Sequence, residues 1–344
     1  MALIKHFEFW PARVFETPYY LYLLWRCLRH GLSPKDLAKA NYALDHGELG
    51  LGSKFTSQMS FDQTHFLPTL FIESNNIDQA SVDKFVEDHG FPLILKPDNG
   101  AVGKGIVKLD SAEALAKALA GLHHNHLLQK FTTANYEYGV FYVRQRGKGM
   151  ITGINRKHFP TVTGDGKRTI AELAAAHPRH TDHWPLFLRY VDTQHIPSAG
   201  EDVQLSFIGS HTMGCKFTDD THLANQAMLR TLEQTFASQP GFNFGRLDVK
   251  AHSEAAFLAG DFVIIEVNGI ASLPTHMFDP TNKLSQAYRI FLRHGKLLSQ
   301  VAAEHRLQPM ELMSYRDIIR KAGNTFAELD EVHAAAKGDQ PAAR

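Results

Sequence analysis

Two apolar segments in the C-terminal half of the chain carry acidic and amide side chains. The first, GRLDVK at residues 245–250, contains Asp248, and the second, DFVIIEVNG at residues 261–269, contains Glu266 and Asn268. Both are typical of buried strands, in which an unpaired acid is costly. Glu266 and Asn268 are two residues apart, so in a strand they project from the same face. Burial of these groups requires a cation or another polar partner.

A neighbouring strand can bring Asp248 beside Glu266 and Asn268, with a polar loop at 252–260 joining the two strands. Three oxygen ligands on one sheet face, with room for waters and phosphate oxygens, suit Mg²⁺, with Mn²⁺ as an alternative. The other interpretation is a strand whose polar face lies in solvent. The segment alone favours neither.

A glycine-rich segment earlier in the chain supplies a second half for such a site. LILKPDNGAVGKGI, residues 93–106, places Lys96 near the end of an apolar strand, followed by Gly100, Gly103, Lys104 and Gly105. A lysine offers a point charge to phosphates, and glycines let backbone N–H groups close over them. A plain turn could have the same glycines. Together with the acidic strands, the loop predicts a two-part site for ATP and a metal.

Composition narrows the class of protein. The 344 residues include 36 basic and 36 acidic side chains, which argues against a nucleic-acid partner held by bulk charge. The chain is 44% hydrophobic and 21% charged, as in globular proteins with two or three subdomains. Cys27 and Cys215 are the only cysteines, so a reducing cytoplasm is expected. No signal peptide is expected, because charged residues and Pro11 interrupt the N-terminal stretch.

An apolar N-terminal segment, PYYLYLLW at residues 18–25, is far shorter than the ~20 residues of a membrane-spanning helix. Because Arg26, Arg29 and His30 follow it, residues 18–30 could form a membrane-surface helix. A helix docked on the protein core is the simpler expectation.

Hydrophobic periodicity and turn residues predict an α+β fold. Ser81 is expected to cap a helix that ends at Gly90, and Ser111 to cap the next helix. Strands are expected at 66–72, 91–98, 126–131, 137–144 and 202–209. Further helices are expected at 222–236, 282–295 and 296–306.

The same pattern suggests four regions. Residues 1–65 form a divergent N-terminal region, 66–130 a small lid subdomain, and 131–310 a larger subdomain with the metal site. Residues 311–344 are expected to be a helix and a frayed tail.

The order of these motifs resembles the ATP-grasp superfamily over roughly residues 50–295, with the closest detail in the D-alanine–D-alanine ligases. The resemblance implies two α+β subdomains that clamp ATP and phosphorylate a carboxylate. Lys54 in GSKFTSQ and Lys96 resemble the two phosphate lysines, and Lys216 in CKFTDDT the lysine near the γ-phosphate. Arg246 matches the arginine that steadies developing negative charge.

The remaining site residues also follow from the resemblance. LLQKFTTANYE is similar to the hinge, which implies that adenine lies against Gln129, Lys130 and Phe131 and that Glu137 binds the ribose. The family usually has Glu where Gln129 stands. Asp248, Glu266 and Asn268 match the metal ligands, and Ser272 and His276 in GIASLPTH fall where the family contacts substrate.

A second resemblance concerns the middle of the chain. TVTGDGKRTIAEL and the run from EDVQLSFIGSHTMG to DDTH look like the ATP-grasp part of cyanophycin synthetase and related amino-acid ligases. A type I′ hairpin turn would also account for GDGK. No half resembling a Mur ligase follows, so cyanophycin synthesis itself is not expected.

The function implied is an ATP-dependent ligase that joins a small-molecule carboxylate to an amine or thiol and releases ADP. Two alternatives remain: a phosphotransferase or carboxylase-type enzyme of the same architecture, and a nucleotide-binding module docked on a membrane or partner. The sequence predicts neither the substrates nor the oligomeric state.

Overall fold

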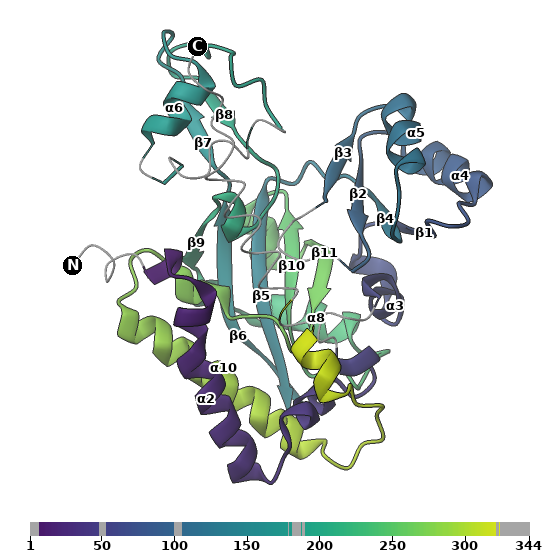
Figure 1. The fold of residues 1–344 in the computed structure, drawn as a ribbon, viewed down its shortest axis with the longest axis vertical. Coiled ribbons are helices and arrows are strands. Elements are labelled where there is room, and N and C mark those ends of the chain that lie inside the picture. Colours follow the sequence, from purple (N-terminus) through teal and green to yellow (C-terminus); the bar gives the residue numbers. More distant parts are fainter. Residues whose placement is uncertain are drawn as a thin grey trace. The chain divides into compact units, whose positions relative to one another are not determined.

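The computed structural model describes residues 7–47, 53–99, 105–177, 179–180, 187, 190–320 and 323. The chain forms two compact units. The first comprises Met1–Gly100, Lys104–Arg156 and Thr218–Asp317, and the second Ala101–Gly103, Lys157–Phe217 and Ile318–Arg344. The fold class is mixed α+β, as the sequence predicts, and the sheets are built from antiparallel pairs (Figure 1).

A four-stranded sheet of order β1-β4-β2-β3 lies in the first unit. Its strands are β1 (Thr69–Ile72), β2 (Leu93–Pro97), β3 (Val107–Leu109) and β4 (His126–Lys130), with helices α4 (Gln79–His89) and α5 (Ala112–Ala120). Ser111 caps α5 as predicted. The predicted cap of α4 is wrong: α4 follows Asp78, whose carboxylate accepts a hydrogen bond from the Ser81 backbone, so Ser81 lies inside the helix.

A five-stranded sheet of order β11-β10-β5-β6-β9 supports the candidate site. The strands are β5 (Tyr136–Gln145), β6 (Lys148–His158), β9 (Lys216–Asp219), β10 (Phe244–Ala251) and β11 (Val263–Asn268). Further helices of the first unit are α2 (Ala12–His30), α3 (Lys54–Met59), α8 (Gln226–Thr235), α9 (Glu254–Ala259) and α10 (Leu284–Glu304). Short 3₁₀ turns are η1 (Phe7–Phe9), η2 (Pro34–Asn41), η3 (Asp45–Gly47), η4 (Gln63–His65), η6 (Thr221–Leu223) and η7 (Thr275–Phe278).

Both faces of this sheet are apolar along much of their length, which explains the continuous apolar runs in the sequence. Alternate residues of β5 and β10, among them Phe141 and Phe244, join the core cluster of α2 and α10. The intervening residues, among them Val140 and Leu247, join a second cluster with α8 and α9. Asp248 continues the Phe244 side of β10, because side chains alternate along a strand. The site therefore lies on the face that α2 and α10 cover elsewhere.

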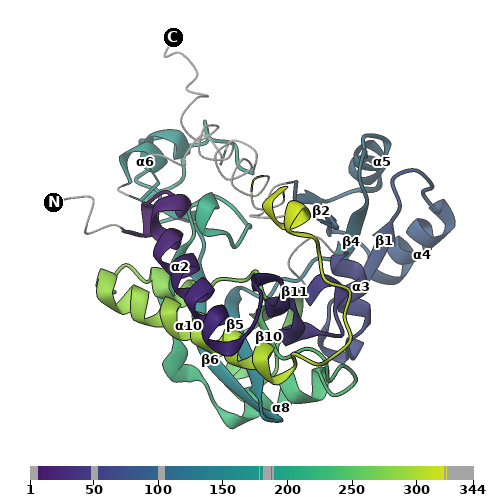
Figure 2. The same cartoon turned by 60° about the horizontal axis from the view of Figure 1, so that its bottom comes forward.

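Helices α2 and α10 lie side by side (Figures 1 and 2). The rings of Tyr19 and Phe291 stack with centroids 3.9 Å apart. Two helices were predicted between 282 and 306, but the structure has a single helix. Gly295 lies inside this helix. A glycine suits the position because a Cβ there would come within 2.8 Å of the Tyr19 ring. The glycine is a packing residue rather than a helix end.

The loop expected at 252–260 contains α9, which Ser253 caps. Helix α2 docks through one face, with Phe15, Tyr19 and Leu23 buried, as the simpler expectation had it. None of the described helices is long and apolar enough to cross a membrane.

The second unit contains a two-stranded sheet of β7 (Thr161–Thr163) and β8 (Asp202–Gln204), with α6 (Ile170–Ala176) and η5 (His211–Met213). The GDGK turn leads into α6, whose cap Thr169 forms a capping box with Glu172. It is not a hairpin turn, because β7 pairs with the distant β8. The strand predicted at 202–209 is confirmed only for its first three residues.

Candidate functional site

Strands β10 and β11 bring the predicted metal ligands together. Asp248 lies directly opposite Glu266, and Arg246 lies opposite Asn268. The amide nitrogen of Asn268 is 3.5 Å from a carboxylate oxygen of Asp248. The three side chains therefore share one face of the sheet, as the spacing of Glu266 and Asn268 predicts.

Arg246 and Asp248 form a two-point ion pair. Nε and Nη2 of Arg246 donate to the two oxygens of Asp248 at 3.1 and 3.3 Å. Nη1 reaches the carbonyl of Leu273 at 3.5 Å. Burial opposes the charge of Arg246, but Asp248 outweighs it and keeps the pKa of Arg246 above its ordinary value. Arg246 is thus held as a fixed cation beside the acids.

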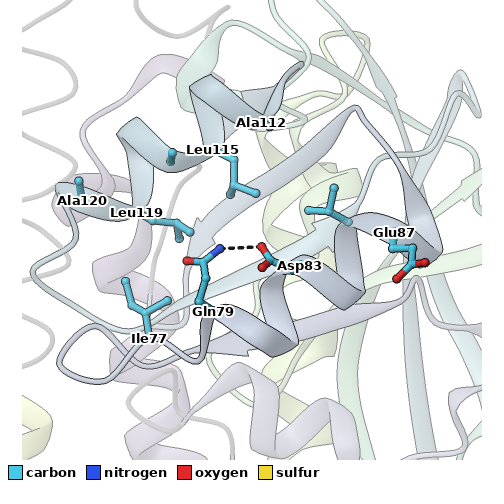
Figure 3. A pocket seen from close by; sticks show the side chains of 10 residues that line it. Ile77, Gln79, Asp83, Glu87, Ala112, Leu115, Leu119 and Ala120 are labelled. Atoms are coloured by element: carbon cyan, nitrogen blue, oxygen red, sulfur yellow. Dashed lines mark hydrogen bonds between the residues drawn. The ribbon is translucent and has the colours of Figure 1, made fainter.

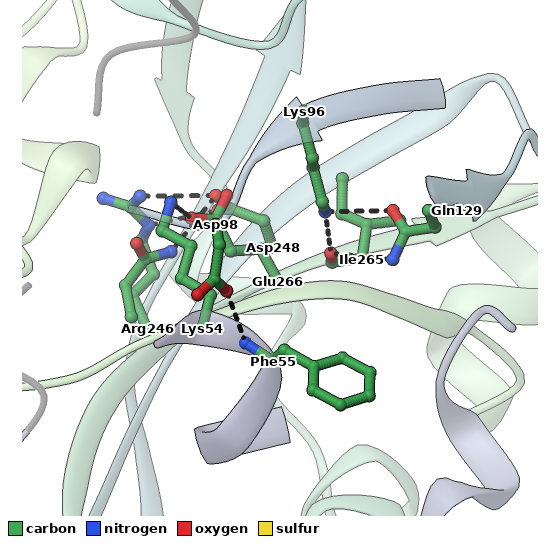
Figure 4. A network of polar contacts seen from close by, with 10 residues as sticks. Lys54, Phe55, Lys96, Asp98, Gln129, Arg246, Asp248, Ile265 and Glu266 are labelled. Atoms are coloured by element: carbon green, nitrogen blue, oxygen red, sulfur yellow. Dashed lines mark hydrogen bonds and ion pairs between the residues drawn. The ribbon is translucent and has the colours of Figure 1, made fainter. Parts of the chain in front are cut away.

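Lys54 pairs with Glu266, Nζ to Oε1 at 2.5 Å (Figure 4). The lysine is the first residue of α3, and two contacts fix the start of that helix. Ser53 accepts a hydrogen bond from the Thr56 backbone at 3.1 Å, and Asp98 accepts one from the Phe55 backbone at 3.0 Å.

Lys96, at the end of β2, reaches from the small sheet to β11. Its Nζ donates to the carbonyl of Ile265 and to Oε1 of Gln129, both at 3.0 Å (Figure 4). Burial lowers the pKa of Lys96 to about 8, although Glu266 opposes the shift. Burial alone would raise the pKa of Glu266, but Lys54 and Lys96 together bring it below its ordinary value. Glu266 therefore stays ionised beside Lys54 and Lys96.

The predicted hinge residues lie in different surroundings. Gln129 is buried, accepts from Lys96 and donates to Thr69 Oγ1 at 2.9 Å. The backbone N–H groups of Lys130 and Phe131 donate to Pro68 and Pro92. Glu137 is buried on β5 opposite Lys250, whose Nζ lies 3.4 Å from Oε2.

The remaining predicted phosphate contacts are in the glycine-rich loop and at Lys216. Gly100, Gly103 and Lys104 lie outside the described residues. Gly105 has a φ of 76°, the left-handed conformation that glycine adopts readily. Lys216 is exposed at the start of β9 and belongs to the second unit.

Ser272 and His276, the predicted substrate contacts, are both buried. Ser272 donates to the carbonyl of Gly269 at 2.6 Å. The His276 ring packs against Gly153, where a Cβ would come within 2.0 Å of it. Burial lowers the pKa of His276 to about 4, so the ring is neutral at pH 7. Its contribution there is a neutral donor or acceptor.

Sequence reasoning missed Asn155. This β6 residue is 1% exposed, and its Oδ1 accepts a hydrogen bond from Thr275 Oγ1 at 2.6 Å. Its Nδ2 has no hydrogen-bond partner among the described residues. The signal available in ITGINRKH was one amide in a strand that carries several other polar residues, a pattern that surface strands also show.

The residues present fit a divalent cation of the Mg²⁺ type. Asp248 and Glu266 are adjacent and oxygen-bearing, Glu266 is held ionised, and Asn268 adds an amide oxygen. Among the described residues no group of three or more His, Cys, Asp and Glu side chains is placed to hold a metal. The candidate set is therefore two carboxylates and an amide, and the rest of the shell would be water and phosphate oxygens.

A hollow of 690 Å³ lies elsewhere, between α4 and α5. Leu115 and Leu119 line it, together with Gln79, which donates to Asp83 at 2.7 Å (Figure 3). None of its lining residues belongs to the charged cluster.

The chain has short sequence matches to two curated proteins. Over 52 residues the chain is 42% identical to the vancomycin C-type resistance protein VanC1 of Enterococcus gallinarum and 35% identical to VanC2 of Enterococcus casseliflavus. Each match covers 15% of this chain, and the chain spans only 15% of these curated relatives. No family model matches the chain.

Among solved structures, D-alanine–D-alanine ligase from Bacillus anthracis matches 73% of this chain and 70% of its own, at 14% identity and a TM-score of 0.40. A bifunctional glutathione synthetase from Pasteurella multocida matches 70% and 36%, at 16% identity and a TM-score of 0.36.

Proposed function

We propose that the protein is an ATP-dependent ligase that joins a small-molecule carboxylate to an amine or thiol through an acylphosphate, releasing ADP and phosphate. The observation that carries this proposal is the acidic pair Asp248 and Glu266, compensated by Lys54, Lys96 and Arg246 on facing elements. Such a cluster suits a reaction in which anions must approach one another.

The charges define what each residue does. A carboxylate oxygen attacks the γ-phosphorus, its O–P bond forms as the bond to the β,γ-bridging oxygen breaks, and ADP leaves. Lys54 and Lys96 would offset the phosphate charge during this step. Lys54 would exchange Glu266 for a phosphate oxygen, which frees Glu266 to ligate the metal.

Bound Mg²⁺, held by Asp248, Glu266 and Asn268, would polarise the phosphate oxygens and offset their charge. In the second step the amine nitrogen attacks the acyl carbon, the C–N bond forms, and the bond to the phosphate oxygen breaks. Phosphate leaves, and the proton of the amine passes to solvent. Arg246 would hold the oxygen that becomes negative. Ser272 and His276 would contact substrate.

ATP is proposed to lie between the two sheets of the first unit, with adenine near Gln129, Lys130 and Phe131 and the ribose at Glu137. The segment with Gly100, Gly103, Lys104 and Gly105 would close over the phosphates and exclude water from the acylphosphate. The assignment of Lys216 to the γ-phosphate follows from the sequence resemblance alone. The proposed compartment is the cytoplasm, where the buried free thiols of Cys27 and Cys215 remain reduced.

The test is nucleotide turnover with hydroxylamine, which traps an acylphosphate as a hydroxamate. The protein is incubated with Mg²⁺, ATP and pools of amino acids and dicarboxylates. ADP with a stoichiometric hydroxamate supports the ligase, and deconvolution of the pool names the acid. ADP with a phosphorylated product that hydroxylamine does not trap would instead favour a phosphotransferase.

The outward face of α2 favours a second candidate activity, contact with an anionic membrane surface. Leu21 and Leu28 are 63% and 79% exposed on this face, and Arg13 and Arg29 flank it. Deleting the helix would remove the buried Phe15 from the core, so flotation with anionic vesicles should compare the intact chain with Leu21→Glu. Unchanged flotation would exclude this contact.

A further inference from the structure

The amide of Asn155 is half satisfied. Its oxygen accepts the hydrogen bond of Thr275, while its Nδ2 is buried and has no partner among the described residues. A buried donor without an acceptor is costly, and native structures rarely keep one without a reason such as a bound ligand or water. The orphan N–H group is therefore a candidate contact for a bound molecule.

The absence of a side chain at Gly139 leaves room for the Asn155 amide. This glycine lies on β5 directly opposite Asp248, in the row that continues to Glu266. A Cβ on Gly139 would come within 2.2 Å of Oδ1 of Asn155 and 3.1 Å of Cδ of Arg246. The Asn155 amide and the Arg246 side chain thus share the space that a missing side chain leaves, next to the proposed metal ligands.

The chemistry around this point selects an anionic oxygen as the ligand. Arg246 is the cation that borders the Gly139 space together with this amide, and Asn155 adds a neutral N–H donor. His276 is neutral at pH 7 and brings no second charge. One fixed cation and one amide donor suit a single oxygen that gains negative charge, because both interactions strengthen as that charge develops.

We propose that Nδ2 of Asn155 donates a hydrogen bond to the acyl oxygen of the bound carboxylate, beside Arg246. This assignment rests on the proposed ligase function and adds a substrate-binding residue to it. The acyl oxygen becomes most negative when the amine adds to the acyl carbon, so the donor contributes chiefly to that step. Gly139 then acts as a positioning residue, because any side chain there would displace the amide.

Three substitutions separate the donor from its surroundings. Asn155→Ala removes the amide, and Asn155→Asp keeps the shape and the Thr275 contact but replaces the donor with an acceptor. Thr275→Ser is the matched control, because it retains the hydroxyl that bonds to Oδ1. If Asn155→Asp fails to fold, Asn155→Ser, which is small and uncharged, takes its place.

Three quantities are measured: the Kd of MgATP, the Kd of the acid, and the rate of hydroxamate formation. The acid is the one that wild-type protein selects from the amino-acid and dicarboxylate pool, and its Kd is measured in the presence of Mg²⁺ and AMP-PNP. We expect Asn155→Ala to lower kcat for the acid by about 10²–10³-fold, the usual effect of removing one oxyanion donor. Asn155→Asp should lower it further and weaken binding of the acid. MgATP binding should be unchanged in both, and Thr275→Ser should behave as wild type.

The outcomes distinguish the two proposals. Wild-type protein that turns over no acid would reject the ligase function itself. Wild-type turnover with unchanged kcat and unchanged acid binding in Asn155→Ala and Asn155→Asp would overturn the role of Asn155 alone. A parallel loss of MgATP binding and acid turnover would also overturn it, because that pattern is expected of a purely structural residue.

Discussion

One face of the five-stranded sheet has two ends with opposite chemistry. At one end Phe141 and Phe244 pack against α2 and α10, and the stabilising contacts are apolar. At the other end the same strands present Gly139 and Asp248, which lie beside charged side chains and the half-satisfied amide of Asn155. In a strand such as β10, the first residues thus pack in the core and the next residues form part of a polar site.

The difference shows how an apolar scaffold can hold charges. At the polar end Arg246 of β10 pairs with Asp248, and Lys54 of α3 and Lys96 of β2 keep the pKa of Glu266 below its ordinary value. Removing one partner from such a buried pair leaves an uncompensated charge. Truncating an apolar side chain instead leaves a cavity, whose cost in stability grows with its volume. The two ends should therefore respond differently to substitution.

The largest effect is expected at the polar end. Asp248→Asn keeps the shape but removes one ionised ligand and the partner of Arg246, so ADP formation should fall by about 10³-fold or more, given that metal catalysis is worth several kcal/mol. ADP release per folded molecule measures it. Activity within a few-fold of wild type would show that Asp248 is a structural ion-pair partner only.

At the apolar end, Phe291→Ala should lower the free energy of unfolding by about 3–5 kcal/mol, because it opens a cavity against Tyr19. Denaturant titration measures the loss. MgATP affinity of the folded fraction should be unchanged, since the ring lies in the α2–α10 cluster. A weakened MgATP affinity would show that the two ends are coupled.

Acid should lower the free energy of unfolding through two buried histidines, His276 and His294. Burial lowers the pKa of His276 to about 4 and of His294 to about 3. The unfolded state, with a pKa near 6.5, takes up protons first, so stability is full above pH 6.5 and falls as the pH approaches 4 and then 3. Each ring should cost roughly 3–5 kcal/mol over its window. His294→Leu should remove its share of the slope, and an unaltered pH profile of unfolding would contradict this.

A smaller effect concerns Lys96. Its pKa of about 8 in the free protein should rise when phosphates replace the neutral contacts around it. MgATP binding should then take up a proton, and affinity should fall about tenfold per pH unit above 8. Lys96→Arg, which stays charged, should bind MgATP without this slope. Calorimetry in buffers of different ionisation enthalpy measures the proton uptake, and its absence would place the phosphates away from Lys96.

Much of this arrangement could be predicted from the sequence. That Glu266 and Asn268 share one face followed from strand periodicity, and the Ser111 cap followed from its local pattern. The single helix α10 was missed, because the tertiary contact of Gly295 with Tyr19 overrides its tendency to end a helix. The cap of α4 was misplaced because Asp78 and Ser81 are both good capping residues.

The site was less predictable than the fold. That Lys54 contacts Glu266 depends on where α3 begins relative to β11, which no local pattern specifies. The orphan amide of Asn155 depends on the empty space at Gly139 in the neighbouring strand. Such features arise from contacts between distant segments and appear only when the sheet is assembled.

The most direct test of the central claim is the identity of the nucleotide product. The reaction is run with Mg²⁺, hydroxylamine and the acid that supports turnover, and its phosphorus compounds are followed by ³¹P NMR. ADP, phosphate and the hydroxamate should form in equal amounts. AMP and pyrophosphate would contradict it, because the acid would then be activated by adenylation and not at the γ-phosphate.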